Sequence, residues 1–229
     1  MARFGRAFPM PMRPLPLLPA FDAAGAGAGG SASLSWSHTI NGSAALVYLT
    51  CDTYTGFNLP PTVACSVGST AMTQLGLVNY FYYSTNSYRI DFFVFGLLNP
   101  PQGLQTISAS ITGKPVNAGL AFANSVSYRT VLSFGTVLSV SGTVSSGSTT
   151  VSQIAASAGQ PLLSQAFANY QTNFSGYNKN QRYLSNASSN GALSLVMGDA
   201  PTPNAAFSAT MAYVNGSNYW GSLIVPMYA

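Results

Sequence analysis

Hydrophobic and polar side chains alternate through most of this chain, starting near residue 34. Leu34, Trp36, His38 and Ile40 occupy alternate positions, and the residues between them are Ser or Thr. A period of two residues is typical of a β-strand with one buried and one exposed face. The dipeptide at 41–42, Asn-Gly, follows directly and favours a tight hairpin turn. The pattern therefore predicts a half-buried strand that leads into a hairpin.

Similar segments recur along the chain, separated by stretches rich in Gly, Pro, Asn and Ser. The expected strands cover residues 34–40, 44–50, 62–67, 74–83, 90–97, 106–112, 119–127, 135–141, 149–155, 164–172, 192–197, 207–214 and 220–228. Many short strands at such intervals are typical of a sandwich. We predict an all-β fold, an antiparallel β-sandwich of jelly-roll-like type over residues 33–229. A short helix is the alternative for residues 162–170.

Residues 1–32 have a different composition. Residues 1–20 contain prolines at positions 9, 11, 14, 16 and 19 and arginines at positions 3, 6 and 13. Prolines at this density favour polyproline II, so we expect an extended Pro-rich N-terminal arm. Residues 23–33 hold Ala, Gly and Ser, the composition of a flexible linker. A secretory signal peptide is the other interpretation, which the prolines and Arg13 disfavour.

Charged residues are few and restrict the partners that we expect. The chain has eight Lys or Arg and four Asp or Glu, which is 5% of its residues, against about 25% in an ordinary soluble domain. A surface so poor in charge is weakly protected against association, which favours a homo-oligomer or larger assembly. After residue 20 the five remaining cations are too scattered to bind nucleic acid. No apolar run reaches the roughly 20 residues of a membrane-spanning helix, so we expect no membrane insertion.

The chain contains few residues that could catalyse a reaction or bind a metal ion. The one histidine, His38, shares the face of Leu34 and Trp36, so we expect it in the core rather than in a Ser–His–Asp triad. The four Asp show no spacing that predicts the carboxylate pair of a glycosidase. One His and two Cys without ligand spacing predict no zinc site, and no phosphate-binding loop is present. We expect no enzyme activity, no metal and no cofactor.

The two cysteines leave an alternative open. Cys51 and Cys65 fall in segments that we expect to form neighbouring strands. A disulfide between them suits a protein that matures outside the cytosol. Two buried free thiols are equally compatible with the sequence.

Aromatic residues gather in two places. The run at 80–83, with Tyr88 nearby, is either an exposed glycan platform or a strand whose alternate rings fill the core and face a neighbouring subunit. The second interpretation is favoured. Tyr170, Tyr177 and Tyr183 lie in an Asn- and Gln-rich stretch. We therefore expect these three residues to form the glycan- or receptor-binding surface, if the protein has one.

Several short segments resemble one known family. They are Met1-Ala2-Arg3-Phe4-Gly5-Arg6-Ala7-Phe8-Pro9, Phe21-Asp22-Ala23, Ser33-Leu34-Ser35-Trp36-Ser37-His38-Thr39, Gly68-Ser69-Thr70-Ala71-Met72-Thr73, Leu97-Leu98-Asn99-Pro100-Pro101-Gln102-Gly103, Ser125-Val126-Ser127-Tyr128, Gln181-Arg182-Tyr183, Gly198-Asp199-Ala200 and Trp220-Gly221. Together they extend over nearly the whole chain. On these segments the chain resembles the β-sandwich family found in minor tail proteins of actinobacterial (mycobacterial) phages, with related domains in adhesin-like proteins.

The resemblance implies a structural virion protein in the phage tail and carries over no catalytic residues. Together with the Pro- and Arg-containing arm, this predicts a minor tail or tail-tip subunit that docks on other tail proteins through its arm, with a host-surface glycan as a candidate second partner. The arm residues expected to make contact are Arg3, Phe4, Arg6, Phe8, Arg13 and Leu15. The alternative is a glycan- or receptor-binding adhesin module, on a phage or as a secreted carbohydrate-binding protein.

Overall fold

The computed structural model describes the chain as an assembly of antiparallel strands. The described residues are 17–30, 32–54, 59–83, 88–144, 149–156, 161–170, 172–186, 193–200, 204–211 and 217–229. Among these residues there is no helix. The predicted all-β fold is confirmed.

The strands follow one another along the chain with short connections. They are β1 (Ala20–Ala24), β2 (Ala28–Gly30), β3 (Ser33–Ile40), β4 (Ala44–Tyr54), β5 (Thr62–Val67), β6 (Thr70–Ala71), β7 (Thr73–Tyr83), β8 (Tyr88–Leu98), β9 (Gly103–Thr112), β10 (Val116–Arg129), β11 (Ser133–Phe134), β12 (Leu138–Val144), β13 (Thr149–Ala156), β14 (Leu162–Tyr170), β15 (Phe174–Tyr177), β16 (Asn180–Ser185), β17 (Leu193–Ala200), β18 (Asn204–Met211) and β19 (Asn218–Tyr228).

Hydrogen bonding joins these strands into four sheets, which we name A to D. Sheet A has the order β1-β10-β4-β8-β7, with β2 also paired to β10. Sheet B has the order β3-β9-β5-β6, and sheet C the order β11-β19-β14-β17-β16, with β12 also paired to β19. Sheet D has the order β13-β18-β15.

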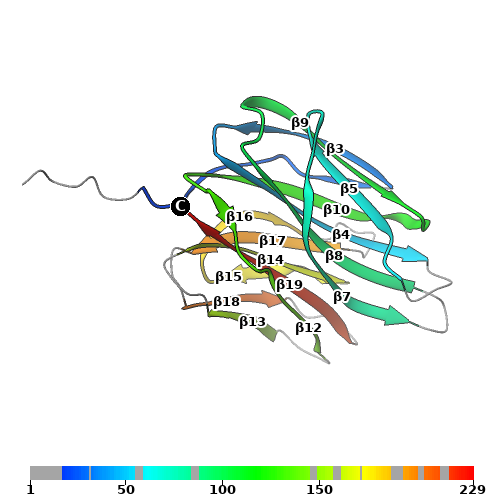
Figure 1. Cartoon of the computed structure of the whole chain (residues 1–229). Coiled ribbons are helices and arrows are strands. Elements are labelled where there is room, and N and C mark those ends of the chain that lie inside the picture. The colour runs from blue at the N-terminus through cyan, green and yellow to red at the C-terminus, as the bar shows by residue number, and fades with distance from the viewer. Residues whose placement is uncertain are drawn as a thin grey trace, which may run out of the picture.

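The sheets stack as four layers in the order B, A, C, D (Figure 1). Three hydrophobic cores fill the spaces between them. Tyr48 and Phe92 belong to the core between sheets A and C. Trp36 belongs to the core between sheets B and A, and Phe167 and Phe207 to the core between sheets C and D. The predicted antiparallel β-sandwich is therefore confirmed, and it contains four sheets rather than two.

Strand β4 shows how its sequence suits a central layer. Leu46 and Tyr48 face the core between A and C, whereas Val47 and Leu49 face the core between B and A. Because both faces are buried, the strand carries a continuous apolar run instead of an alternating one. Residues 162–170, for which a helix was the alternative, form β14 for the same reason, and eight of its nine residues are buried.

The prediction of a flexible linker over residues 23–33 is wrong for its described residues. Strands β1 and β2 both pair with β10, so the sandwich begins by residue 20. Gly25 N donates a hydrogen bond to Ser125 O at 2.8 Å. A Cβ at Gly25 would lie 2.4 Å from Ser125 Oγ, and Gly27 has φ +74°. The glycines therefore allow close approach to β10 rather than flexibility.

Candidate functional site

His38 lies in a buried chain of hydrogen bonds between β3 and β10. Its Nδ1 is 2.7 Å from Ser125 Oγ, and its Nε2 is 3.2 Å from Ser127 Oγ. Trp36 Nε1 donates to Ser125 Oγ at 2.9 Å, and Ser127 Oγ donates to Asp22 Oδ2 at 2.8 Å. His38 is 2% exposed, so the prediction that it is a core residue is confirmed.

The order of donors fixes the tautomer of His38. The hydroxyl proton of Ser127 goes to Asp22, so Ser127 Oγ accepts from His38 Nε2. Nδ1 is then unprotonated and accepts from Ser125. Burial lowers the pKa of His38 to about 4, which keeps the ring neutral.

This cluster has the residue types of a Ser–His–Asp triad without an approach for a substrate. Ser125 and Ser127 are fully buried, and Trp36 and Gly25 contact Ser125. A nucleophilic serine needs space for a carbonyl carbon beside its Oγ. The geometry supports a structural role, in which the chain of bonds joins strands that lie about ninety positions apart in the sequence.

Asp22 anchors the first strand to this cluster. Its carboxylate accepts hydrogen bonds from Asn41 N, Ser127 Oγ and Arg129 Nε, at 2.8, 2.8 and 2.9 Å. Burial by itself would raise the pKa of Asp22, but these donors outweigh it and lower the pKa. The carboxylate therefore stays charged and holds β1 where the chain enters the sandwich.

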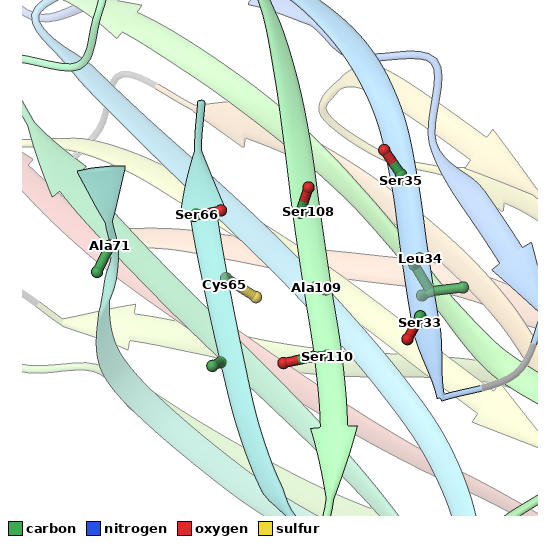
Figure 2. Close-up of a pocket in the computed structure, with 10 residues that line it drawn as sticks. Ser33, Leu34, Ser35, Cys65, Ser66, Ala71, Ser108, Ala109 and Ser110 are labelled. Atoms are coloured by element: carbon green, nitrogen blue, oxygen red, sulfur yellow. The ribbon is translucent and has the colours of Figure 1, made fainter. Parts of the chain in front are cut away.

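Sheet B carries a shallow groove on its outer face (Figure 2). Serine side chains of neighbouring strands line it, whereas Cys65 belongs to the core between B and A. Burial raises the pKa of the Cys65 thiol to about 12, so it is not a nucleophile. The groove offers hydroxyls and small side chains and no group that could catalyse a reaction. Its lining residues are Ser33, Leu34, Ser35, Ala64, Cys65, Ser66, Ala71, Ser108, Ala109 and Ser110.

Three exposed leucines mark one end of the strands, which we call the arm end. Leu17, Leu18 and Leu132 are 76%, 57% and 74% exposed. Ala20 pairs with Arg129, and Leu132 N donates to Tyr228 O at 2.7 Å. Residues 129–132 therefore connect the start of β1 with the end of the final strand, β19. The first described residues lie beside the C-terminus (Figure 1). The three leucines give this surface a chemistry that suits apolar packing.

Residues 1–16 of the predicted arm are outside the part of the chain that the structure describes. The expected contact residues Arg3, Phe4, Arg6, Phe8, Arg13 and Leu15 all fall within residues 1–16. Their role stays a prediction.

Five aromatic residues define the opposite end of sheets A and C, which we call the aromatic end: Tyr54, Phe81, Tyr88, Tyr170 and Tyr219. The Tyr54 and Tyr88 rings are 4.7 Å apart, and Tyr88 donates a hydrogen bond to Tyr54. Phe81 lies 5.7 Å from Tyr170 and 4.3 Å from Tyr219. Tyr54 is 40% exposed, and the other four are half-buried. The end therefore presents rings and phenol hydroxyls.

A buried carboxyl group lies next to these rings. Asp52 is on the same face of β4 as Tyr54, two residues earlier, and its Oδ2 accepts from Asn117 Nδ2 at 3.1 Å. No partner is found for Oδ1 within the described ranges. Burial raises the pKa of Asp52 to about 6. The group is thus a half-satisfied acceptor beneath the aromatic rings.

The predicted tyrosine surface is not assembled. Tyr177 lies in the core between C and D, where it donates to Gln165 Oε1 at 2.7 Å. Tyr183 packs 6.2 Å from Phe122, and Tyr170 belongs to the aromatic end. All three are half-buried, and Tyr177 lies on the other side of sheet C from the remaining two.

The aromatic run at 80–83 divides between core and surface. Tyr80 is 5% exposed and bonds Thr50 through its hydroxyl, whereas Phe81 belongs to the aromatic end. The side chains of residues 82 and 83 are not described. Sequence reasoning missed Tyr54 and Tyr219, although Tyr219 directly precedes a predicted strand and Tyr54 lies four residues beyond the end of another.

Both cysteines are free and buried in the core between B and A. Burial raises the pKa of both thiols, with the carboxylates of Asp91 and Asp52 adding to the effect at Cys51. Of the two alternatives for Cys51 and Cys65, the structure has the free thiols.

The remaining acids are neutralised by arginines. Arg89 and Asp91 approach to 2.7 Å, and Arg182 and Asp199 approach to 2.6 Å. In the described ranges there is no group of three or more His, Cys, Asp or Glu that could hold a metal ion. Nor do those ranges contain a helix able to cross a membrane.

Comparison of the chain with protein-family models, curated proteins and solved structures finds no match.

Proposed function

We propose that this protein is a structural component of a phage virion, a minor tail or tail-tip subunit held by its N-terminal arm. The observation that carries the proposal is the arm end. Leu17, Leu18 and Leu132 leave an apolar surface exposed at the point where the arm joins the sandwich. Exposed apolar patches of this kind favour contact with a neighbouring protein.

The molecule also has two distinct ends, as such a subunit needs. Strand β4 runs from Ala44, beside the arm end, to Tyr54 at the aromatic end. At a rise of about 3.3 Å per residue, the two ends are roughly 33 Å apart. A subunit attached at the first end presents the second to its surroundings.

Low surface charge supports packing against further subunits. Three of the four acids form ion pairs with arginines, and the fourth, Asp52, is buried. With so little charge to repel a second copy or another tail protein, a close-packed assembly costs little electrostatic energy. We propose that the partners are other virion proteins and further copies of the chain.

The arm supplies the attachment in this proposal. Phe4, Phe8 and Leu15 are its apolar anchors, and Arg3, Arg6 and Arg13 meet acidic or carbonyl groups of the neighbour. Residues that order only on binding lose roughly 1 kcal/mol or more each in backbone entropy, which the anchors must offset.

Deletion of residues 2–16 tests the proposal. Because β1 begins at Ala20, the deletion should leave the sandwich folded, with an unchanged melting temperature. Incorporation into particles, measured by quantitative mass spectrometry of purified virions, should be lost. A matched control replaces Leu59, which is 69% exposed and precedes β5 at the opposite end of sheet B, with Ala and should assemble normally. Normal occupancy of the truncated protein in virions would refute the proposal.

A second candidate function is a glycan- or receptor-binding adhesin, which the aromatic end favours. Rings with hydroxyl groups are common in recognition surfaces because they offer a large rigid area and a polar tip. The two functions are compatible, since one concerns the arm end and the other the opposite end.

A further inference from the structure

We infer that the aromatic end is a binding site for a neutral saccharide, with the Tyr54 and Tyr88 rings as its stacking platform. This deepens the host-contact part of the proposed function, on which its biological meaning rests, by naming a site and a ligand class. The site is not the surface predicted from Tyr170, Tyr177 and Tyr183.

The Tyr54–Tyr88 pair is already in place for stacking. The two residues are directly paired on β4 and β8, their rings are 4.7 Å apart, and their hydroxyls share a hydrogen bond of 3.2 Å. That bond is the main cause of the raised pKa of Tyr88. A saccharide C–H face is attracted to the negative face of a ring, and a ring that is already fixed loses little entropy on binding.

The second group of rings extends the platform across two sheets. Phe81 on β7 contacts Tyr170 on β14 and Tyr219 on β19. Rings from sheets A and C are therefore found at the same end of the strands as the Tyr54–Tyr88 pair.

Asp52 places a buried carboxyl group beneath this surface. Its Oδ2 is bonded to Asn117, but Oδ1 has no donor among the described residues. A buried acceptor without a partner costs roughly 1–3 kcal/mol. Because Oδ1 has no exposed surface, a ligand does not reach it, and the carboxyl group acts on the site only through its charge, which disfavours an anionic ligand.

The charges around the site favour a neutral ligand over an acidic one. Arg89 is held by Asp91 on the opposite face of β8. Lys114 precedes Pro115, whose carbonyl accepts a hydrogen bond from Tyr54 N, so one further cation is near. With Asp52 beside it, a single lysine does not form the cluster of cations that anionic saccharides need.

The experiment uses the full chain and a panel of neutral hexasaccharides, namely maltohexaose, cellohexaose, mannohexaose and galactohexaose. Glycan-array screening identifies the ligand, and isothermal titration calorimetry gives its Kd. Tyr54→Ala and Tyr88→Ala should each raise the Kd about tenfold, which corresponds to about 1.4 kcal/mol. Tyr228→Ala, the same change at the arm end, is the matched control and should leave the Kd unchanged.

Two further measurements test the chemistry of the ligand. Asp52→Asn should leave the Kd of a neutral saccharide within about twofold, because the carboxyl group is buried and does not contact the ligand. Raising the salt concentration from 50 to 500 mM should leave the Kd within about twofold, because no ion pair forms with a neutral ligand.

Three outcomes would overturn the inference. They are no binding of any of the four saccharides at millimolar concentration, a Kd that Tyr54→Ala and Tyr88→Ala do not change, and preferential binding of acidic saccharides that salt abolishes. None of these outcomes affects the assembly proposal, because the isolated chain is used here and virion incorporation is measured separately.

Discussion

The arm end and the aromatic end are formed by the same strands but expose different chemistry. Strand β19 runs from Tyr219 at the aromatic end to Tyr228 at the arm end, and the residues between them are buried. At the arm end the exposed hydrophobic side chains are aliphatic leucines beside Arg129, whereas at the other end they are phenols above a buried carboxyl group. In sheets A and C the middles of the central strands are constrained by packing on both faces, whereas their ends are exposed.

The two ends also differ in their buried ionisable groups. Near the arm end, the Asp22–Ser127–His38 chain is fully hydrogen-bonded and holds a neutral histidine. At the aromatic end, Asp52 is half-satisfied and has a raised pKa. The first arrangement stabilises an attachment point. The second sacrifices stability at a surface that we propose binds a ligand.

The largest expected effect on stability comes from weakening the core between sheets A and C, which both ends share. Phe92 is fully buried between sheets A and C, and Phe92→Ala should lower the free energy of unfolding by about 3–5 kcal/mol. Urea unfolding measures the change, and hydrogen exchange should show loss of protection at both ends.

The control for this variant is Leu104→Ala, at a side chain that is 74% exposed, which should change stability by less than about 0.5 kcal/mol. If Phe92→Ala destabilised one end alone, the two ends would not share a core, and the comparison between them would fail.

Acid should weaken the arm end first, because of His38. Its folded pKa of about 4 lies below the ordinary 6.5, so its contribution is complete above pH 6.5 and is lost as the pH falls towards 4. The loss amounts to about 3 kcal/mol. His38→Gln should remove this pH dependence, which melting temperatures between pH 4 and pH 8 will reveal. An unchanged acid profile in the variant would show that His38 is not the group that titrates.

A smaller and opposite effect is expected at the aromatic end. The folded pKa of Asp52, about 6, lies above the ordinary 3.8, so its contribution is complete below pH 3.8 and is lost as the pH rises through 6. Asp52→Asn should therefore stabilise the protein at pH 8 by roughly 2 kcal/mol and have little effect at pH 4. Urea unfolding at the two pH values is the measurement. A destabilised variant at pH 8 would contradict it.

The local sequence determined the strands that have one exposed face. The alternation of Leu34, Trp36 and Ile40 with Ser and Thr predicts β3, and the structure buries those three residues together with His38. This works because a side chain's face is set by its position along the strand, which is a property of neighbouring residues.

Features that depend on distant partners could not be predicted in this way. The apolar run of β14 indicates burial but not which two sheets cover it, so four stacked sheets were not expected. The Ala and Gly of residues 23–30 suggest a linker until Ser125, about a hundred positions later, is placed against Gly25. The composition shows which residues are small, but it does not show which distant residues pack against them in the fold.

The candidate sites follow the same division. The sequence identified aromatic residues as candidates for recognition, yet it grouped Tyr177 with Tyr170, which face different cores. It missed Tyr54 because its partner Tyr88 is 34 positions away and joins it only through the pairing of β4 with β8. The composition of a strand is a property of neighbouring residues in the sequence, but the register and stacking of the sheets arise from contacts between remote segments. These contacts decide which side chains meet at a surface.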